Sequence, residues 1–162
     1  MTAAIDPGIL RQHLAGLEIE LGTAADGALR LVVGAEQSLV LLRRLRDEPE
    51  IDLRRLVDLT AIDRGVARGR FEVVYLLASS APNARVRIHV PLDEGEPIID
   101  SVVALWPAAD WLEREVFDLF GITFRAHPNL RRILLEPDFE GAPLRKDHPL
   151  QLDRPLPEKV VL

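Results

Sequence analysis

The 162-residue sequence contains no cysteine. That absence excludes disulfide bonds, thiolate zinc sites, cysteine nucleophiles and iron–sulfur clusters held by this chain alone. Redox chemistry associated with the chain must therefore take place on groups that other molecules hold.

Long apolar runs, aromatic residues and an excess of positive charge are also lacking. No segment approaches the roughly 20 apolar residues of a membrane span, and the first twenty residues lack the basic region of a signal peptide. The formal net charge of -6 repels nucleic-acid phosphates and anionic lipid headgroups. With 5% aromatic residues, a base-stacking platform is poorly supplied. We expect a cytoplasmic protein that binds no nucleic acid and reaches a membrane only through a partner.

Sequence motifs for cofactors and nucleophiles are missing as well. There is no Walker loop and no GxSxG nucleophile elbow. The segment from Gly65 to Gly69 lacks both the glycine spacing and the following helix of a dinucleotide fingerprint. The residues therefore predict neither a bound cofactor nor a catalytic nucleophile.

The hydrophobic pattern of the first ninety residues predicts a mixed fold. A content of 48% hydrophobic and 28% charged residues is that of a globular domain. Periodicity and turn signals predict a helix after Asp6-Pro7, strands over 17–21 and 28–33 around the Asp26-Gly27 turn, a helix over 35–47, and strands over 56–62, 70–78 and 85–90. This order predicts an α+β fold, a two-layer α/β sandwich with a helix-strand-strand-helix-strand-strand-strand core and its helices on one sheet face.

Prolines punctuate the sequence after Pro91 and leave room for one further helix. That helix is expected over 108–120, ended by Gly121, and the chain from His127 onward is expected to be extended. We therefore divide the chain into a single α+β domain of residues 1–121 and an extended C-terminal tail of residues 122–162. The apolar and arginine content of the tail predicts that it lies on another surface.

The last helix carries an apolar stripe beside clustered charges. Its carboxylates Glu113, Glu115 and Asp118 are expected to meet Arg131-Arg132 and Arg145-Lys146-Asp147 if the tail folds back. Such ion pairs would fix the register of the tail. The same three carboxylates with His127 suggest a hard-metal or acid–base site as an alternative, although their spacing matches no metal motif.

Four ordered segments of this region carry a family resemblance. They are ERE at 113–115, DLFGI at 118–122, HPNLRRIL at 127–134 and GAPLRKDHP at 141–149. Together they resemble the signature of the C-type subunit of NADH-quinone oxidoreductase, respiratory complex I, which is also called its 30 kDa subunit. The upstream segments LVDLTAID at 56–63, RFEVVYLL at 70–77 and LWPAADWLERE at 105–115 resemble the same family.

Two residues depart from the family pattern. Ala126 stands where the family usually has glycine before the His-Pro pair, and His148 stands where it usually has an aromatic residue. If the family glycine has positive φ, the backbone at Ala126 must differ slightly or carry modest strain.

The resemblance implies a non-catalytic subunit of the hydrophilic arm. It implies no flavin, iron–sulfur cluster, metal or quinone bound by this chain; the complex uses FMN, iron–sulfur clusters, NADH and quinone through other subunits. It implies packing against the D-type subunit, which with the B-type subunit forms the quinone site, and a peripheral place on the cytoplasmic side of the bacterial plasma membrane. The matching positions are expected to order the tail and its partner interface: Glu113, Arg114, Glu115, Asp118, His127, Pro128, Arg131, Arg132, Arg145, Lys146 and Asp147.

Three other interpretations stay open at this point. Equivalent subunits occur in membrane-bound hydrogenases and in ferredoxin- or F420-linked quinone oxidoreductases, and these motifs separate them poorly. A free-standing carboxylate metal enzyme is a more distant alternative. A scaffold domain without redox connection explains the composition but not the ordered motifs.

Overall fold

The computed structural model describes residues 5–65, 70–79 and 84–149. In chain order the elements are α1 (Pro7–His13), β1 (Ile19–Thr23), β2 (Leu29–Val33), α2 (Ala35–Asp47), β3 (Arg55–Asp63), β4 (Phe71–Ala78), β5 (Arg85–Leu92), β6 (Ile98–Asp100), α3 (Ala109–Phe120) and β7 (Thr123–Arg125). The predicted α+β class and the order of its core elements are confirmed.

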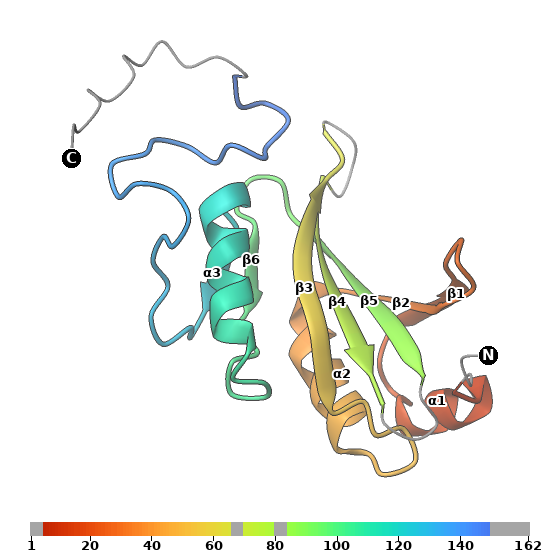
Figure 1. The fold of residues 1–162 in the computed structure, drawn as a ribbon. Coiled ribbons are helices and arrows are strands. Elements are labelled where there is room, and N and C mark those ends of the chain that lie inside the picture. Colours follow the sequence, from red (N-terminus) through yellow and green to blue (C-terminus); the bar gives the residue numbers. More distant parts are fainter. Residues whose placement is uncertain (1–4, 66–69, 80–83, 150–162) are drawn as a thin grey trace.

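A five-stranded sheet with the order β1-β2-β5-β4-β3 forms the centre of the fold (Figure 1). Within the described residues of this sheet, β2 and β5 pair in parallel and the other neighbouring strands pair antiparallel. Alternate residues point to opposite faces of a strand, and Tyr75 on β4 is directly opposite Ile88 on β5. Both side chains are fully buried, so this face carries the core.

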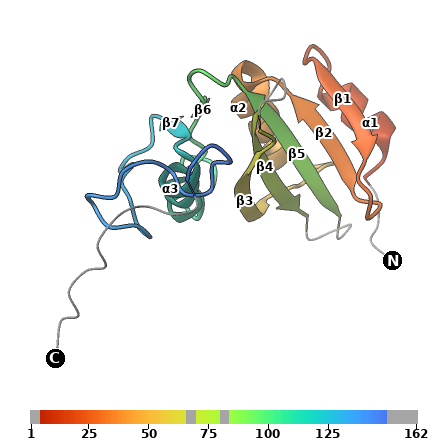
Figure 2. The ribbon, with the colours of Figure 1, turned by 90° about the horizontal axis from the view of Figure 1, so that it is seen from above.

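Helices α1 and α2 cover that same face (Figure 2). Leu10 of α1 and Leu41 of α2 are fully buried in one cluster with the inward side chains of the sheet. Asp6 begins α1 by accepting a hydrogen bond from the N–H of Gly8 at 2.7 Å, with Pro7 in the first turn. Apolar spacing therefore sets both helices as the sequence predicts, and the Asp6 cap begins α1.

Helix α3 lies beside β3 at one edge of the sheet (Figure 1). It ends at Gly121, whose φ of 69° is left-handed, as the sequence predicts for a helix-terminating glycine. An added Cβ there would also lie 3.4 Å from the Nη1 atom of Arg145, so glycine suits both the backbone and the neighbouring tail.

A small parallel pair of strands, β6 and β7, is absent from the prediction. Each has three residues, too few for a period-two pattern to be recognised. The pair brings Ile99 and Phe124 into the core, so the chain just after Gly121 is still part of the packed structure. The division at residue 121 into domain and tail stays a prediction.

From His127 to Pro149 the chain contains neither helix nor strand, as predicted. This segment runs along α3 and then returns toward the sheet (Figure 1). Residues 150–162 of the predicted tail lie outside the described residues. In the part of the chain that the structure describes, no helix has the length and apolarity to cross a bilayer.

Candidate partner-docking site

Asp118 anchors the tail to the last turn of α3. Its Oδ2 atom accepts hydrogen bonds from the N–H groups of Ile133, Leu134 and Leu135 at 3.0, 2.8 and 3.0 Å, and its Oδ1 atom lies 2.6 Å from Nη1 of Arg132. Three consecutive N–H groups turned toward one oxygen form an anion-binding nest. Burial opposes ionisation of Asp118, but these N–H groups and the guanidinium outweigh it and lower the pKa of the carboxyl. The predicted pairing of Asp118 with Arg132 is confirmed.

Arg114 holds the tail from the neighbouring turn of α3. Its Nε atom donates to the backbone carbonyl of Arg131 at 3.1 Å, and its guanidinium lies 5.0 Å from the centre of the Trp111 ring. Arg114 is only 6% exposed, whereas Trp111 is 64% exposed. The helix thus presents a large aromatic surface over a buried cation.

The tail and α3 enclose a groove of about 610 Å³ at this place. Its walls combine apolar and cationic side chains: Trp111, Arg114, Phe117, Arg131, Arg132, Ile133, Leu135 and Pro137. Leu134, between two of these residues, is 59% exposed. Exposed tryptophan beside arginine is typical of a protein interface.

Glu113 lies on the buried side of α3. Its Oε1 atom accepts a hydrogen bond from the N–H of Val102 at 2.6 Å, while its Oε2 atom is buried without a partner among the described residues. Burial raises the pKa of Glu113 to about 7, opposed by hydrogen bonds from Ser101 and Val102 and supported by the charge of Asp110.

His127 approaches Glu113 and Asp110 of α3 with its Nε2 atom. Its Nδ1 atom accepts a hydrogen bond from the N–H of Asn129 at 2.9 Å, so the ring proton lies on Nε2, 3.2 Å from the carbonyl oxygen of Asp110. The Nε2 atom is 3.9 Å from Oε2 of Glu113.

The second part of the tail touches the end of α3 through the N–H of Leu144, which donates to the Leu119 carbonyl at 3.0 Å, but its charged residues meet the sheet. The N–H of Lys146 donates to Oδ2 of Asp63 at 2.8 Å, and Asp147 pairs with Arg70 at 2.8 Å. The guanidinium of Arg145 lies 4.6 Å from the centre of the Phe71 ring. The prediction that Arg145, Lys146 and Asp147 meet the carboxylates of α3 is therefore wrong.

The residues that receive this part of the tail are not among those selected from the sequence. Arg70 binds Asp63 through two parallel hydrogen bonds of 3.0 Å, and both side chains are buried. The Arg70 guanidinium lowers the pKa of Asp63, with burial opposing and the N–H groups of Lys146 and Gly65 assisting. The sequence does indicate this pair: LVDLTAID ends with Asp63 and RFEVVYLL begins with Arg70, so a charged residue stands at one end of each apolar segment.

The two departures from the family pattern have distinct structural consequences. Ala126 has φ of 60°, so it adopts the left-handed conformation that a glycine would take without strain. The His148 ring packs over Gly141, where an added Cβ would lie 2.9 Å from two ring atoms. The backbone at Ala126 therefore carries the strain considered above, and His148 makes a local ring contact.

The other predicted site residues are dispersed around this framework. Pro128 is exposed in the turn after His127, Arg131 is exposed beside the groove, and Glu115 is half-buried without an ion pair in the described part of the chain. The alternative metal set of Glu113, Glu115, Asp118 and His127 does not form a ligand cluster within residues 5–65, 70–79 and 84–149. Asp118 already uses both carboxylate oxygens to hold the tail.

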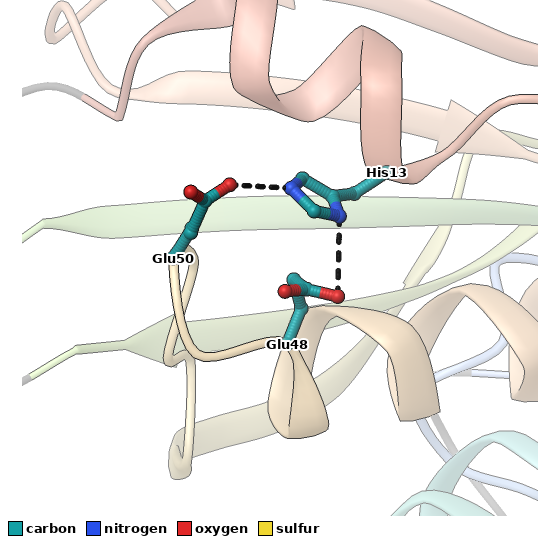
Figure 3. A group of neighbouring side chains, drawn as sticks. All are labelled: His13, Glu48 and Glu50. Atoms are coloured by element: carbon teal, nitrogen blue, oxygen red, sulfur yellow. Dashed lines mark hydrogen bonds and ion pairs between the residues drawn. The ribbon is translucent and has the colours of Figure 1, made fainter.

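Within the described ranges, one group of three side chains has metal-ligand spacing: His13, Glu48 and Glu50 (Figure 3). The two ring nitrogens of His13 face different carboxylates, Glu48 at 3.1 Å and Glu50 at 2.6 Å. In the observed arrangement the imidazole bridges the end of α1 to the residues that follow α2.

Comparison with known proteins identifies a family. A sequence model described as "Respiratory-chain NADH dehydrogenase, 30 Kd subunit" matches residues 31–154. The C-type subunit of NADH-quinone oxidoreductase from Hyphomonas neptunium is 48% identical over 124 residues, covering 76% of this chain and 61% of that protein. The combined C/D-type subunit from Methylococcus capsulatus is 46% identical, covering 78% of this chain and 23% of that protein. The chain thus spans 61% and 65% of the length of two of the curated relatives that it matches.

Two solved structures share the fold. A trypsin-resistant fragment of Nqo5 superposes with a TM-score of 0.63 at 28% identity, covering 76% of this chain and 97% of the fragment. A chain of the membrane-bound sulfane sulfur reductase, an archaeal respiratory membrane complex, superposes with a TM-score of 0.72 at 26% identity, covering 88% of this chain and 85% of the other.

Proposed function

Because this chain belongs to the family of the 30 kDa subunit of respiratory-chain NADH dehydrogenase, we propose that it is a non-catalytic subunit of a proton-pumping NADH-quinone oxidoreductase. In this proposal it packs in the hydrophilic arm against the D-type subunit, with the B-type subunit and other arm subunits nearby, and supports electron transfer from NADH to quinone. It sits peripherally on the cytoplasmic side of the plasma membrane. FMN, iron–sulfur clusters, NADH and quinone are held by other subunits.

The observation that carries the proposal is the surface formed by α3 and the tail. Asp118 and Arg70 hold the described tail on its own domain, and this arrangement leaves Trp111 and Leu134 exposed beside an arginine-lined groove. A rigid surface with exposed apolar anchors suits docking because little ordering entropy is lost on binding.

The identity of the partner is supported by a fused relative. The protein from Methylococcus capsulatus is named as a combined C/D-type subunit, so in that organism the two subunits form one chain. We infer that the D-type subunit of the same genome is the direct partner of the present chain.

A second candidate follows from the archaeal complex. The superposition on a chain of the sulfane sulfur reductase supports the equivalent role in a related membrane complex, a class that includes hydrogenases and ferredoxin- or F420-linked oxidoreductases. Neighbouring genes decide between them: flavin and NADH-binding subunits indicate the respiratory enzyme, and nickel-binding subunits indicate a hydrogenase.

Co-expression with the D-type subunit tests the proposal. A tagged form of this chain should retain the untagged D-type subunit in an equimolar complex, and the chain alone should have no NADH–quinone reductase activity. A deletion strain should recover that activity in its membranes when the gene is returned. Failure of the D-type subunit to co-purify with a folded chain, together with unchanged activity in the deletion strain, would contradict the proposal.

A further inference from the structure

Arg114 is a buried cation without a carboxylate partner in the described part of the chain. It is 6% exposed, and its recorded interactions are the hydrogen bond from Nε to the Arg131 carbonyl and the contact with the Trp111 ring. A buried arginine normally has an anionic partner, because transfer of a charge out of water is costly. Neighbouring Arg132 shows the contrast, since its guanidinium binds Asp118.

The groove over Arg114 concentrates positive charge in an acidic protein. The whole chain has a net charge of -6, yet the charged side chains that line this groove are all arginines. Arg131 at its rim is exposed and makes no ion pair within the described ranges. The groove therefore attracts an anion, and its low-dielectric apolar walls strengthen that attraction.

The apolar walls restrict the kind of anion. Trp111 and Leu134 are mostly exposed, and Phe117 and Ile133 line the groove beside Arg114. A small inorganic anion would neutralise the cation but would leave these surfaces in water. A carboxylate on a polypeptide, flanked by apolar residues, would both neutralise the cation and cover the apolar surfaces.

We propose that the groove between α3 and the tail binds an acidic side chain, Asp or Glu, from an extended segment of the partner subunit. Its carboxylate pairs with Arg114, with Arg131 adding charge at the rim, and its apolar neighbours cover Trp111 and Leu134. This inference rests on the proposed function and specifies which kind of side chain the partner subunit contributes to the interface. Arg132 is excluded from the pairing because Asp118 already occupies it.

Affinity measurements with the purified D-type subunit test the pairing. Arg114→Met should weaken binding about tenfold or more, because the acidic side chain of the partner would then be buried without a counter-charge. Trp111→Ala, at an exposed position, should also weaken binding without affecting the fold. Arg87→Met is the matched control, because Arg87 on β5 pairs with Asp26, away from α3, and this variant should bind as the wild type does.

A cross-link identifies the partner residue directly. Lys146 and Lys159 are the only lysines of the chain. With both replaced by arginine, Arg114→Lys places a single lysine amine in the groove. Carbodiimide treatment of the complex should then join position 114 to an Asp or Glu of the D-type subunit by an amide bond. The same chain with Arg114 retained is the control and should give no such product.

The outcomes separate this inference from the proposed function. Wild-type chain that does not bind the D-type subunit contradicts the proposed function itself. Wild-type binding that is unchanged by Arg114→Met and Trp111→Ala overturns only the acidic-segment proposal. A cross-link from position 114 to Asp153 or Glu158 of the same chain would also overturn it, because the groove would then serve its own tail.

Discussion

The Oδ1 atom of Asp118 lies 2.6 Å from Nη1 of Arg132, which joins the last turn of α3 to a residue fourteen positions later. The other carboxylate oxygen binds three consecutive backbone N–H groups of the same tail segment. One buried side chain therefore fixes both the direction and the register of the tail. The shape of the proposed docking surface depends on this contact.

Replacing Asp118 should release this segment. Asp118→Asn keeps the volume but removes the charge and turns an amide N–H₂ group toward donors, so we expect a loss of about 2–4 kcal/mol in the free energy of unfolding. Glu115→Gln on the same helix is the control and should change it by less than about 0.5 kcal/mol. Urea denaturation followed by tryptophan fluorescence measures both. Equal stability of the two variants would show that the tail anchor is dispensable.

Glu113 should make stability depend on pH. Its pKa is raised from 4.5 to about 7 by burial, so the unfolded chain loses this proton at lower pH than the folded chain does. The contribution of protonated Glu113 to the free energy of unfolding, about 3 kcal/mol, is fully present below pH 4.5 and is lost as the pH rises through 7. Glu113→Gln, which carries no titrating proton, should remove this contribution. A variant with the same pH dependence as the wild type between about pH 5 and 8 would contradict the assignment.

Asp63 and Arg70 should be strongly coupled. Their side chains are 2% and 7% exposed and share two hydrogen bonds, so a double-mutant cycle of Asp63→Asn and Arg70→Met should give a coupling energy of about 2–4 kcal/mol. The exposed pair Asp26–Arg87 should give less than about 1 kcal/mol. Similar coupling energies for the two pairs would argue against the buried clamp.

Ala126→Gly should stabilise the chain. Ala126 has φ of 60°, and relief of left-handed strain at a non-glycine residue is worth roughly 1 kcal/mol after the greater flexibility of the unfolded glycine is subtracted. Ala109, within α3 and fully buried, provides the opposite control, because glycine there loses both helix propensity and a packed methyl group. Thermal unfolding of the two variants should shift in opposite directions. A lower melting temperature for Ala126→Gly would refute the strain argument.

The elements that the sequence predicts correctly are those whose signal is local. The Asp26-Gly27 turn, the Asp6-Pro7 helix start and the Gly121 helix end depend on the conformations of a few adjacent residues. The pairing of Asp118 with Arg132 could also be predicted from the sequence, because a carboxylate on α3 is followed closely by two arginines that can pair with it.

The features that sequence reasoning missed depend on contacts far along the chain. Lys146 binds Asp63 eighty-three residues earlier, and no local pattern indicates that approach. Strands β6 and β7 are recognised only through each other, since neither has enough residues to show alternation. The burial of Arg114 without an ion pair among residues 5–65, 70–79 and 84–149 likewise follows from how the tail packs on α3 rather than from helical spacing.

Hydrogen exchange of the chain with and without the D-type subunit tests the central claim most directly. If α3 and the tail form the docking surface, the amides of residues 129–135 should exchange at least about tenfold more slowly in the complex, while the hairpin turn at 24–28 should be unchanged. A stable complex in which residues 129–135 exchange as they do in the free chain, with new protection elsewhere, would contradict the account.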